Sequence, residues 1–176
     1  MAVQTFLFAD DGQTPNNPHL PMIVYPAAVD IDGLSDPAVP FERMFDRHGW
    51  GDGWRNGIYS FRHFHTTNHE VLGIARGRAR VEFGGAKGEI LTVSAGDVVV
   101  LPAGTGHRKL ESSRDLLVVG AYPRNVPVDQ KRAGEADLDA ARMAIARVPL
   151  PVMDPVNGSE GPLVRLWHNA HQVKPS

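Results

Sequence analysis

Residues 57–77, GIYSFRHFHTTNHEVLGIARG, decide the fold together with residues 96–107, GDVVVLPAGTGH. Apolar and polar residues alternate over Arg78–Phe83, while Val98–Leu101 is a continuous apolar run of the kind found in strands covered on both faces. Turns rich in glycine separate these runs, so the sequence predicts strands at 58–65, 70–76, 78–84, 89–93, 97–101 and 115–121. Strands this short, with no helices between them, favour an antiparallel sandwich or barrel over a parallel sheet.

The segments on either side of this region are expected to add a few peripheral elements. Residues 5–8 and 20–25 are predicted to be extended, and residues 36–48 and about 135–147 to be short helices. The proline- and glycine-rich tail, 149–176, is predicted to be an irregular arm that packs back on the barrel. No repeat is visible, so residues 1–176 are expected to form one domain, divided into N-terminal strands and helix (1–56), barrel motifs (57–123) and a helix with a C-terminal arm (124–176).

Charge and cysteine content exclude several classes of function. The 176 residues carry 18 basic and 20 acidic side chains, a net charge of −2, and no block of like charge resembles the basic surface that nucleic-acid binding needs. There is no cysteine, which excludes disulfides, thiolate chemistry, iron–sulfur clusters and cysteine-based zinc sites. No nucleic-acid partner is therefore expected.

Targeting segments are not visible in the sequence. Residues 1–10 lack the basic region and apolar run of a signal peptide, and no stretch approaches the roughly 20 apolar residues of a membrane span. The sequence therefore predicts a cytoplasmic protein without a membrane partner.

Four of the eight histidines fall in the predicted barrel, and three of them have the spacing of metal ligands. His63 and His65, two residues apart on a predicted strand, would project from one face within about 7 Å of strand rise. Glu70 begins the next strand, so a tight turn would bring it alongside, and the turn at 102–106 is stiff enough to present His107 inward. A His-x-His pair on its own is more often an ordinary surface feature.

These residues resemble the two motifs of the cupin superfamily. The first motif is matched by Gly57, His63, His65, Glu70 and Gly77, and the second by Gly96, Pro102, Gly104 and His107. Glu111 stands where that motif usually has asparagine, a position that does not ligate metal in the family. Over nearly its whole length the chain is similar to the uncharacterised YjlB-type cupins. The resemblance implies a double-stranded β-helix, that is, a jelly-roll barrel, with His63, His65, Glu70 and His107 projecting into its mouth.

Donor chemistry indicates the kind of ion that these four residues would hold. Three neutral imidazoles and one carboxylate suit one divalent first-row ion, namely Fe, Mn, Ni, Co, Cu or Zn. Up to two positions stay open in an octahedral site, as a catalytic metal requires. One carboxylate leaves the site with a charge of about +1, which favours an anionic ligand or hydroxide.

Three further side chains are candidates for the site. His69 neighbours Glu70 and would point away on a regular strand, but a bulge would turn it inward as a catalytic proton shuttle; otherwise it is a turn residue with its bonds satisfied. Tyr59 and Phe61 share strand parity with His63 and are candidates for the substrate pocket, although plain core packing is the simpler explanation. Trp50 and Trp54 are expected in a loop, as core or as lid.

Two classes of function follow. The first is a metal-dependent enzyme that acts on a small organic molecule by oxygenase- or isomerase-type chemistry at a mononuclear centre of three histidines and one glutamate. The alternative is a non-catalytic cupin that senses or stores a small molecule or metal. A third possibility is a structural barrel with vestigial histidines. Cupins of this kind are commonly dimers, and the N-terminal extended segments offer open strand edges, so a homodimer is expected.

Overall fold

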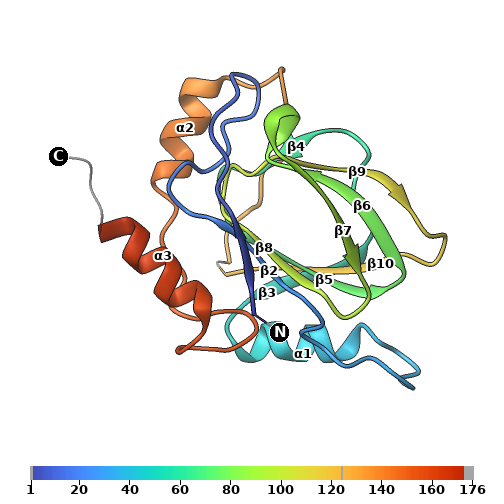
Figure 1. Ribbon diagram of the computed structural model, residues 1–176. Coiled ribbons are helices and arrows are strands. Elements are labelled where there is room, and N and C mark those ends of the chain that lie inside the picture. The colour runs from blue at the N-terminus through green and yellow to red at the C-terminus, as the bar shows by residue number, and fades with distance from the viewer. Residues whose placement is uncertain (1, 124, 173–176) are drawn as a thin grey trace.

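Two antiparallel sheets face each other at the centre of the protein, whose computed structural model describes residues 2–123 and 125–172 (Figure 1). The six-stranded sheet has the order β1 (Gln4–Phe6), β2 (Met22–Tyr25), β8 (Val98–Leu101), β5 (Glu70–Arg76), β10 (Leu117–Tyr122) and β3 (Gly51–Asn56). The five-stranded sheet has the order β11 (Lys131–Arg132), β4 (His63–Phe64), β9 (His107–Ser112), β6 (Arg78–Phe83) and β7 (Glu89–Ser94). The predicted all-β, double-stranded β-helix with a few short peripheral helices is confirmed.

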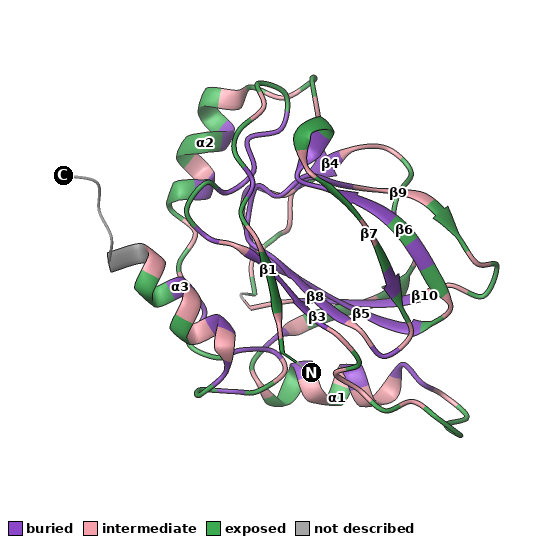
Figure 2. Cartoon of the chain, in the orientation of Figure 1, coloured by how far each residue is buried: buried purple, intermediate pink, exposed green. Residues whose placement is uncertain are grey.

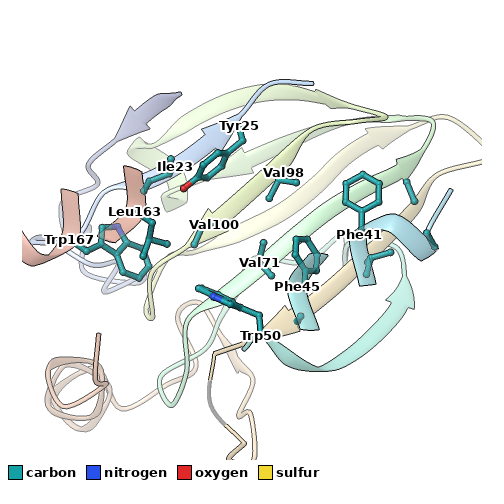
Figure 3. Packing of buried hydrophobic residues seen from close by; sticks show 14 of the residues in the cluster. Ile23, Tyr25, Phe41, Phe45, Trp50, Val71, Val98, Val100, Leu163 and Trp167 are labelled. Carbon is teal, nitrogen blue, oxygen red and sulfur yellow. The ribbon is translucent and has the colours of Figure 1, made fainter. Parts of the chain in front are cut away.

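The four inner strands of the six-stranded sheet, β2, β8, β5 and β10, are buried on both faces, as Figure 2 shows, whereas the edge strands β1 and β3 are largely exposed. Alternate residues such as Leu72 and Val99 point between the two sheets, where they join one apolar cluster. Their neighbours Val71 and Val100 point outward into a second cluster, which the helices cover (Figure 3). Burial on both faces explains the continuous apolar run of β8, as predicted.

Helix α1 (Val39–Arg47) covers part of the outer face through Phe41 and Phe45, which lie one turn apart and are both buried. Pro40 falls in the first turn of the helix, where the missing N–H costs no hydrogen bond. Gly73 of β5 makes room for this helix, because a Cβ atom there would lie 2.3 Å from the ring of Phe41.

Two further helices follow the barrel. Helix α2 (Leu138–Ala146) is capped by Asp137, whose carboxylate accepts a hydrogen bond from the backbone N–H of Ala140. The expectation of an irregular arm is wrong for α3 (Pro162–Gln172), whose Leu163 and Trp167 pack on the outer face of the six-stranded sheet (Figure 3). Those two apolar residues are spaced as on one helix face, a pattern that the flanking prolines and glycines obscured. The last four positions of the predicted arm, 173–176, lie outside the described residues.

Three strand predictions need correction. Only His63 and Phe64 of the predicted strand 58–65 are extended as β4, because the chain bends at residues 60–61. Residues 51–56 are not a loop but the edge strand β3, whose glycines and polar residues hid it. Residues 107–112 form β9, which was missed because only its first residue is buried and no apolar alternation marks it.

Within residues 2–123 and 125–172, no helix combines the length and the apolar character needed to cross a membrane. The predicted homodimer stays a prediction.

Candidate metal centre

The four predicted ligands meet at one end of the barrel, from both sheets. His63 lies on β4 and is the register partner of His107, the first residue of β9. His65 directly follows β4, and Glu70 begins β5 in the opposite sheet. The turn between β8 and β9 is joined to this group, because the backbone N–H of Gly104 donates to the carbonyl oxygen of His65 at 2.7 Å.

The donor atoms of the cluster lie within the span of a single ion. One nitrogen from each of His63, His65 and His107 falls within 4.8 Å of the others, and all three side chains are buried or nearly so. One carboxylate oxygen of Glu70, Oε2, lies 3.3 Å from Nε2 of His65 and 3.4 Å from Nε2 of His107. Bonds of about 2.0–2.2 Å to a common centre would fit donors at these separations.

Backbone carbonyls fix the tautomer of all three histidines. Nδ1 of His63 faces the carbonyl oxygen of Phe61 at 3.1 Å, and Nδ1 of His107 faces that of Thr105 at 3.0 Å. Nδ1 of His65 makes the same bond to the carbonyl oxygen of Asp129. A carbonyl only accepts, so Nδ1 carries the proton in each ring, and Nε2 has the lone pair whenever the ring is neutral. The Nε2 atoms of His65 and His107 lie beside the carboxylate of Glu70, and an Nδ1–H bonded to a carbonyl oxygen is the arrangement that orients metal-ligating histidines.

Glu70 is the member of the group that most needs a polar partner, because its carboxylate is buried. Its Oε1 atom accepts a hydrogen bond from the hydroxyl of Tyr122 at 3.4 Å. Its Oε2 atom has no hydrogen-bond partner of acceptable geometry within the described part of the chain, despite the two nearby imidazoles. A buried carboxylate oxygen without a donor is costly, and a cation at this point removes the cost.

The pKa values of His63 and His65 are shifted in opposite directions in the metal-free cluster. Burial, and then the neighbouring His107, lower the pKa of His63 to about 3. Burial is the largest single influence on the pKa of His65 and acts to lower it, but the charge and hydrogen bond of Glu70 together with Asp129 outweigh burial and raise that pKa to about 9. Burial alone would raise the pKa of Glu70, yet His65 and His107 hold it well below its ordinary value. The metal-free cluster therefore keeps an anionic Glu70 and stores one proton on His65.

A cavity of about 390 Å³ opens beside the cluster. Tyr59 lines it and stays half exposed, and its contact with a substrate stays a prediction. Phe61 is not one of the lining residues: the bend at residues 60–61 breaks the strand parity, and its ring stacks on Tyr59 and lies under the guanidinium of Arg132. Several other lining residues were not predicted from the sequence. They come from β3, β9, β10 and the segment before β11: Trp54, Lys109, Tyr122 and Gln130.

His69 does not join the cavity. Its Nδ1 atom accepts a hydrogen bond from the backbone N–H of Ala103, so the proton lies on Nε2, which faces the carbonyl oxygen of Pro149 at 3.1 Å. The ring also packs on Trp167, and the residue is almost fully buried. The structure thus offers no support for His69 as a catalytic proton shuttle, since both ring nitrogens tie separate segments together.

One curated relative identifies the family. YjlB, an uncharacterised protein of Bacillus subtilis strain 168, is 41% identical to the chain over 164 residues, which cover 93% of this chain and 96% of that one. The chain is a YjlB-type cupin. The fold and the motif residues of this cupin agree with that membership, although no family model matches the chain.

Several solved cupin structures follow a similar course. An acireductone dioxygenase of Bacillus anthracis with cadmium in its active centre matches at 15% identity and a TM-score of 0.36, covering 50% of this cupin and 60% of that chain. An oxalate decarboxylase of Bacillus subtilis with Mn(II) centres matches at 16% identity and a TM-score of 0.34, and the match covers 69% of this cupin and 30% of that chain. A DUF861 family protein of Thermotoga maritima matches at 20% identity and a TM-score of 0.31, and the match covers 50% of this cupin and 92% of that chain. This cupin spans less than two thirds of the first two chains, and none of these likenesses indicates its chemistry.

The donor set defines what the cupin cluster can hold. Three neutral imidazoles suit a divalent transition-metal ion, and the nitrogens of His63, His65 and His107 are grouped closely enough to share one. The second carboxylate oxygen of Glu70 is engaged by Tyr122, so Oε2 is the atom available to an ion.

Proposed function

We propose that this cupin is a metal-dependent protein that acts on a small organic molecule at a mononuclear centre of His63, His65, His107 and Glu70. The chemistry proposed is of oxygenase or isomerase type. The single observation that supports it most strongly is the orientation of the donors. Three backbone carbonyls accept from the Nδ1 atoms, which leaves Nε2 of each ring as the ligand atom, and the buried Oε2 atom of Glu70 lies next to two of these nitrogens.

Different residues of the chain would position the ligands of such an ion and line its cavity. A bound divalent ion would act as a Lewis acid that polarises an oxygen of the small molecule. The carbonyl oxygens of Phe61, Asp129 and Thr105 hold the imidazoles in place. Tyr122 orients Glu70, while the apolar side chains of Ile58 and Leu72 exclude water from one side of the cavity.

Metal analysis of protein purified without a tag tests the proposal. We expect close to one equivalent of a transition metal in the wild type, and loss of most metal affinity in His65→Ala without loss of the fold. The matched control is His19→Ala, an exposed histidine outside the cavity, which should retain the metal. Less than about a tenth of an equivalent in the wild type, with no thermal shift on adding Mn²⁺, Co²⁺ or Zn²⁺, would overturn the proposal.

The enzyme and the binding protein differ in what they do to a ligand. Incubating the iron- or manganese-loaded protein in air with a panel of diketones and sugars would separate them. Oxygen consumption or a new product supports the enzyme. Saturable heat of binding with the ligand recovered unchanged supports the alternative, a metallo-cupin that senses or stores a small molecule.

A further inference from the structure

The cavity beside the metal cluster carries an excess of positive charge. Glu70 is the one carboxylate among its lining residues within the described chain, whereas Lys109 and Arg55 are both cations. With three neutral histidines, a divalent ion would add more positive charge than Glu70 removes. Cavities lined by one sign of charge concentrate ligands of the opposite sign.

Of the two cations, Arg55 is already neutralised. Its guanidinium makes two hydrogen bonds to Glu42, of 2.6 and 2.8 Å, and one of 2.9 Å to Asp36. These carboxylates belong to α1 and the segment before it, and neither lines the cavity. Arg55 therefore lines the cavity but adds little net positive charge to it.

Unlike Arg55, Lys109 has no carboxylate close to its charged group within the described residues. It lies two residues beyond His107 on β9, so both side chains belong to the same face of the strand, about 7 Å apart along it. Its backbone N–H is fixed by the carbonyl oxygen of Tyr59 at 2.8 Å, which holds this part of the strand against the mouth of the cavity. Across residues 2–123 and 125–172, no carboxylate lies within 4.0 Å of its ammonium group.

Two positive centres thus lie along one cavity, separated by about two strand residues. We propose, on the basis of the function proposed above, that the cavity takes a small dicarboxylate. One carboxylate would lie at the histidine cluster and the other at the ammonium of Lys109. A divalent ion, one glutamate and one lysine together carry a formal charge of about +2, which a dianion neutralises and a monoanion does not. Such a ligand pairs both positive centres, whereas a monoanion pairs one of them and a neutral ligand pairs neither.

The remaining walls limit the ligand to a short chain. Ile58 and Leu72 are buried and apolar, and the indole of Trp54 adds an aromatic surface. A cavity of about 390 Å³ lies near the small end of the range for small-molecule sites. The spacing of the two positive centres favours two carboxylates joined by a short methylene chain, with its CH₂ groups against the apolar side.

Cobalt-loaded protein provides a test that does not depend on turnover. The absorption bands of Co²⁺ report ligands that enter its coordination shell, and they would be titrated with malonate, succinate and glutarate, with acetate and succinamide as monoanionic and neutral probes. We expect at least one dicarboxylate to bind at least tenfold more tightly than acetate, and succinamide to have no effect. In Lys109→Met, the affinity for that dicarboxylate should fall at least tenfold while the acetate affinity changes less than twofold. Lys131→Met, an exposed lysine outside the cavity, should behave as wild type.

The outcomes separate this inference from the proposed function. Stoichiometric Co²⁺ binding in which no dicarboxylate exceeds acetate, or in which Lys109→Met matches Lys131→Met, overturns the dicarboxylate assignment and leaves the metal centre standing. Failure of the wild type to bind Co²⁺ overturns both. Circular dichroism and a thermal melt of each variant show whether a loss of binding comes from a loss of fold.

Discussion

The indole N–H of Trp54 donates a hydrogen bond of 2.8 Å to the phenolic oxygen of Tyr122. The indole lies over β10 at Gly120, where a Cβ atom would be 2.1 Å from the ring. Because its oxygen accepts from Trp54, Tyr122 has its own proton free to donate to Glu70. Burial, and then the charge of Glu70, raise the pKa of Tyr122 above its ordinary value, which keeps the donor protonated. A chain of two hydrogen bonds thus runs from edge strand β3 to the predicted metal ligand.

Removing the Tyr122 hydroxyl should weaken metal binding without abolishing it. In Tyr122→Phe the Oε1 atom of Glu70 loses its donor, and we expect the affinity for Co²⁺ or Zn²⁺ to fall about tenfold, the lower end of the effect of outer-shell partners. Competition with a chromogenic chelator measures this. Tyr59→Phe is the matched control, because Tyr59 lines the same cavity but its hydroxyl makes no hydrogen bond to Glu70. Equal affinities in the two variants would show that Tyr122 does not orient the ligand.

Metal uptake should release a proton, with a predictable pH dependence. Because the pKa of His65 is raised to about 9 in the metal-free cluster, a metal ion must displace its proton at any pH below that value. Between pH 6 and 8 the apparent affinity should therefore rise about tenfold per pH unit. Calorimetry in buffers of different ionisation enthalpy should report close to one proton released per ion at pH 7. Uptake without proton release would show that His65 is neutral before the metal arrives.

Stability at acid pH should depend on Glu82. This buried carboxylate pairs with Arg62 at 2.6 Å and with Arg108 at 2.9 Å. Burial acts to raise the pKa of Glu82, but the two guanidinium groups outweigh it and hold that pKa below the ordinary 4.5. Glu82→Gln should cost on the order of 2 kcal/mol of unfolding free energy at pH 7, since two partly buried cations lose their partner.

The sign of the pH effect follows from the lowered pKa. The contribution of Glu82 is complete above the unfolded pKa of about 4.5 and disappears as the pH falls through the folded value. The difference in urea midpoint between wild type and Glu82→Gln should therefore shrink below pH 4.5. Glu111→Gln breaks an exposed pair with Arg80 in the same sheet and should cost less than about 0.5 kcal/mol at any pH. A cost in Glu82→Gln that stays constant with pH would contradict this account.

The contact between Gly73 and Phe41 should limit what the outer sheet face tolerates. Gly73→Ala places a methyl group where the ring lies, and we expect a loss of about 1–3 kcal/mol from overpacking. Adding Phe41→Leu to the Gly73→Ala variant should recover part of the lost unfolding free energy, because leucine leaves room for the added methyl group. Gly57→Ala, with no atom within 4 Å of the added carbon, should change stability by less than about 0.5 kcal/mol. Chemical denaturation measures all four proteins, and equal losses at both glycines would refute the steric explanation.

The sequence predicted the fold class where its pattern was strong. The apolar run of β8 and the alternation of β6 indicated strands correctly, because burial on two faces or on one leaves a direct mark on composition. Strand β9 left no such mark, since it runs from buried His107 to exposed Ser112 in a sheet with one open face. Helix α3 was missed because only two of its described residues, Leu163 and Trp167, are fully buried, and they stand in a segment rich in proline and glycine.

The cluster was predictable for a different reason from its surroundings. The spacing of His63 and His65 fixes their common direction through local backbone geometry alone, and both point to the cluster. The walls of the cavity depend on long-range pairing that no local pattern encodes. Trp54 and Tyr122 are 68 positions apart in the chain, and they meet only because β3 pairs with β10. Asp129, whose carbonyl oxygen accepts from His65, likewise lies 64 positions away in a polar segment.

The pairing of His63 with His107 restricts how the cluster can adapt to ionic radius. These two imidazoles are neighbours in one β-ladder, with ring centroids 4.1 Å apart, so their separation is set by the backbone. Glu70 comes from the opposite sheet, and His65 is the residue directly after β4. A larger ion would therefore require widening of the space between the two sheets, and a smaller one narrowing of it. Selectivity among metals of similar donor preference then depends on the stiffness of the barrel wall behind Glu70.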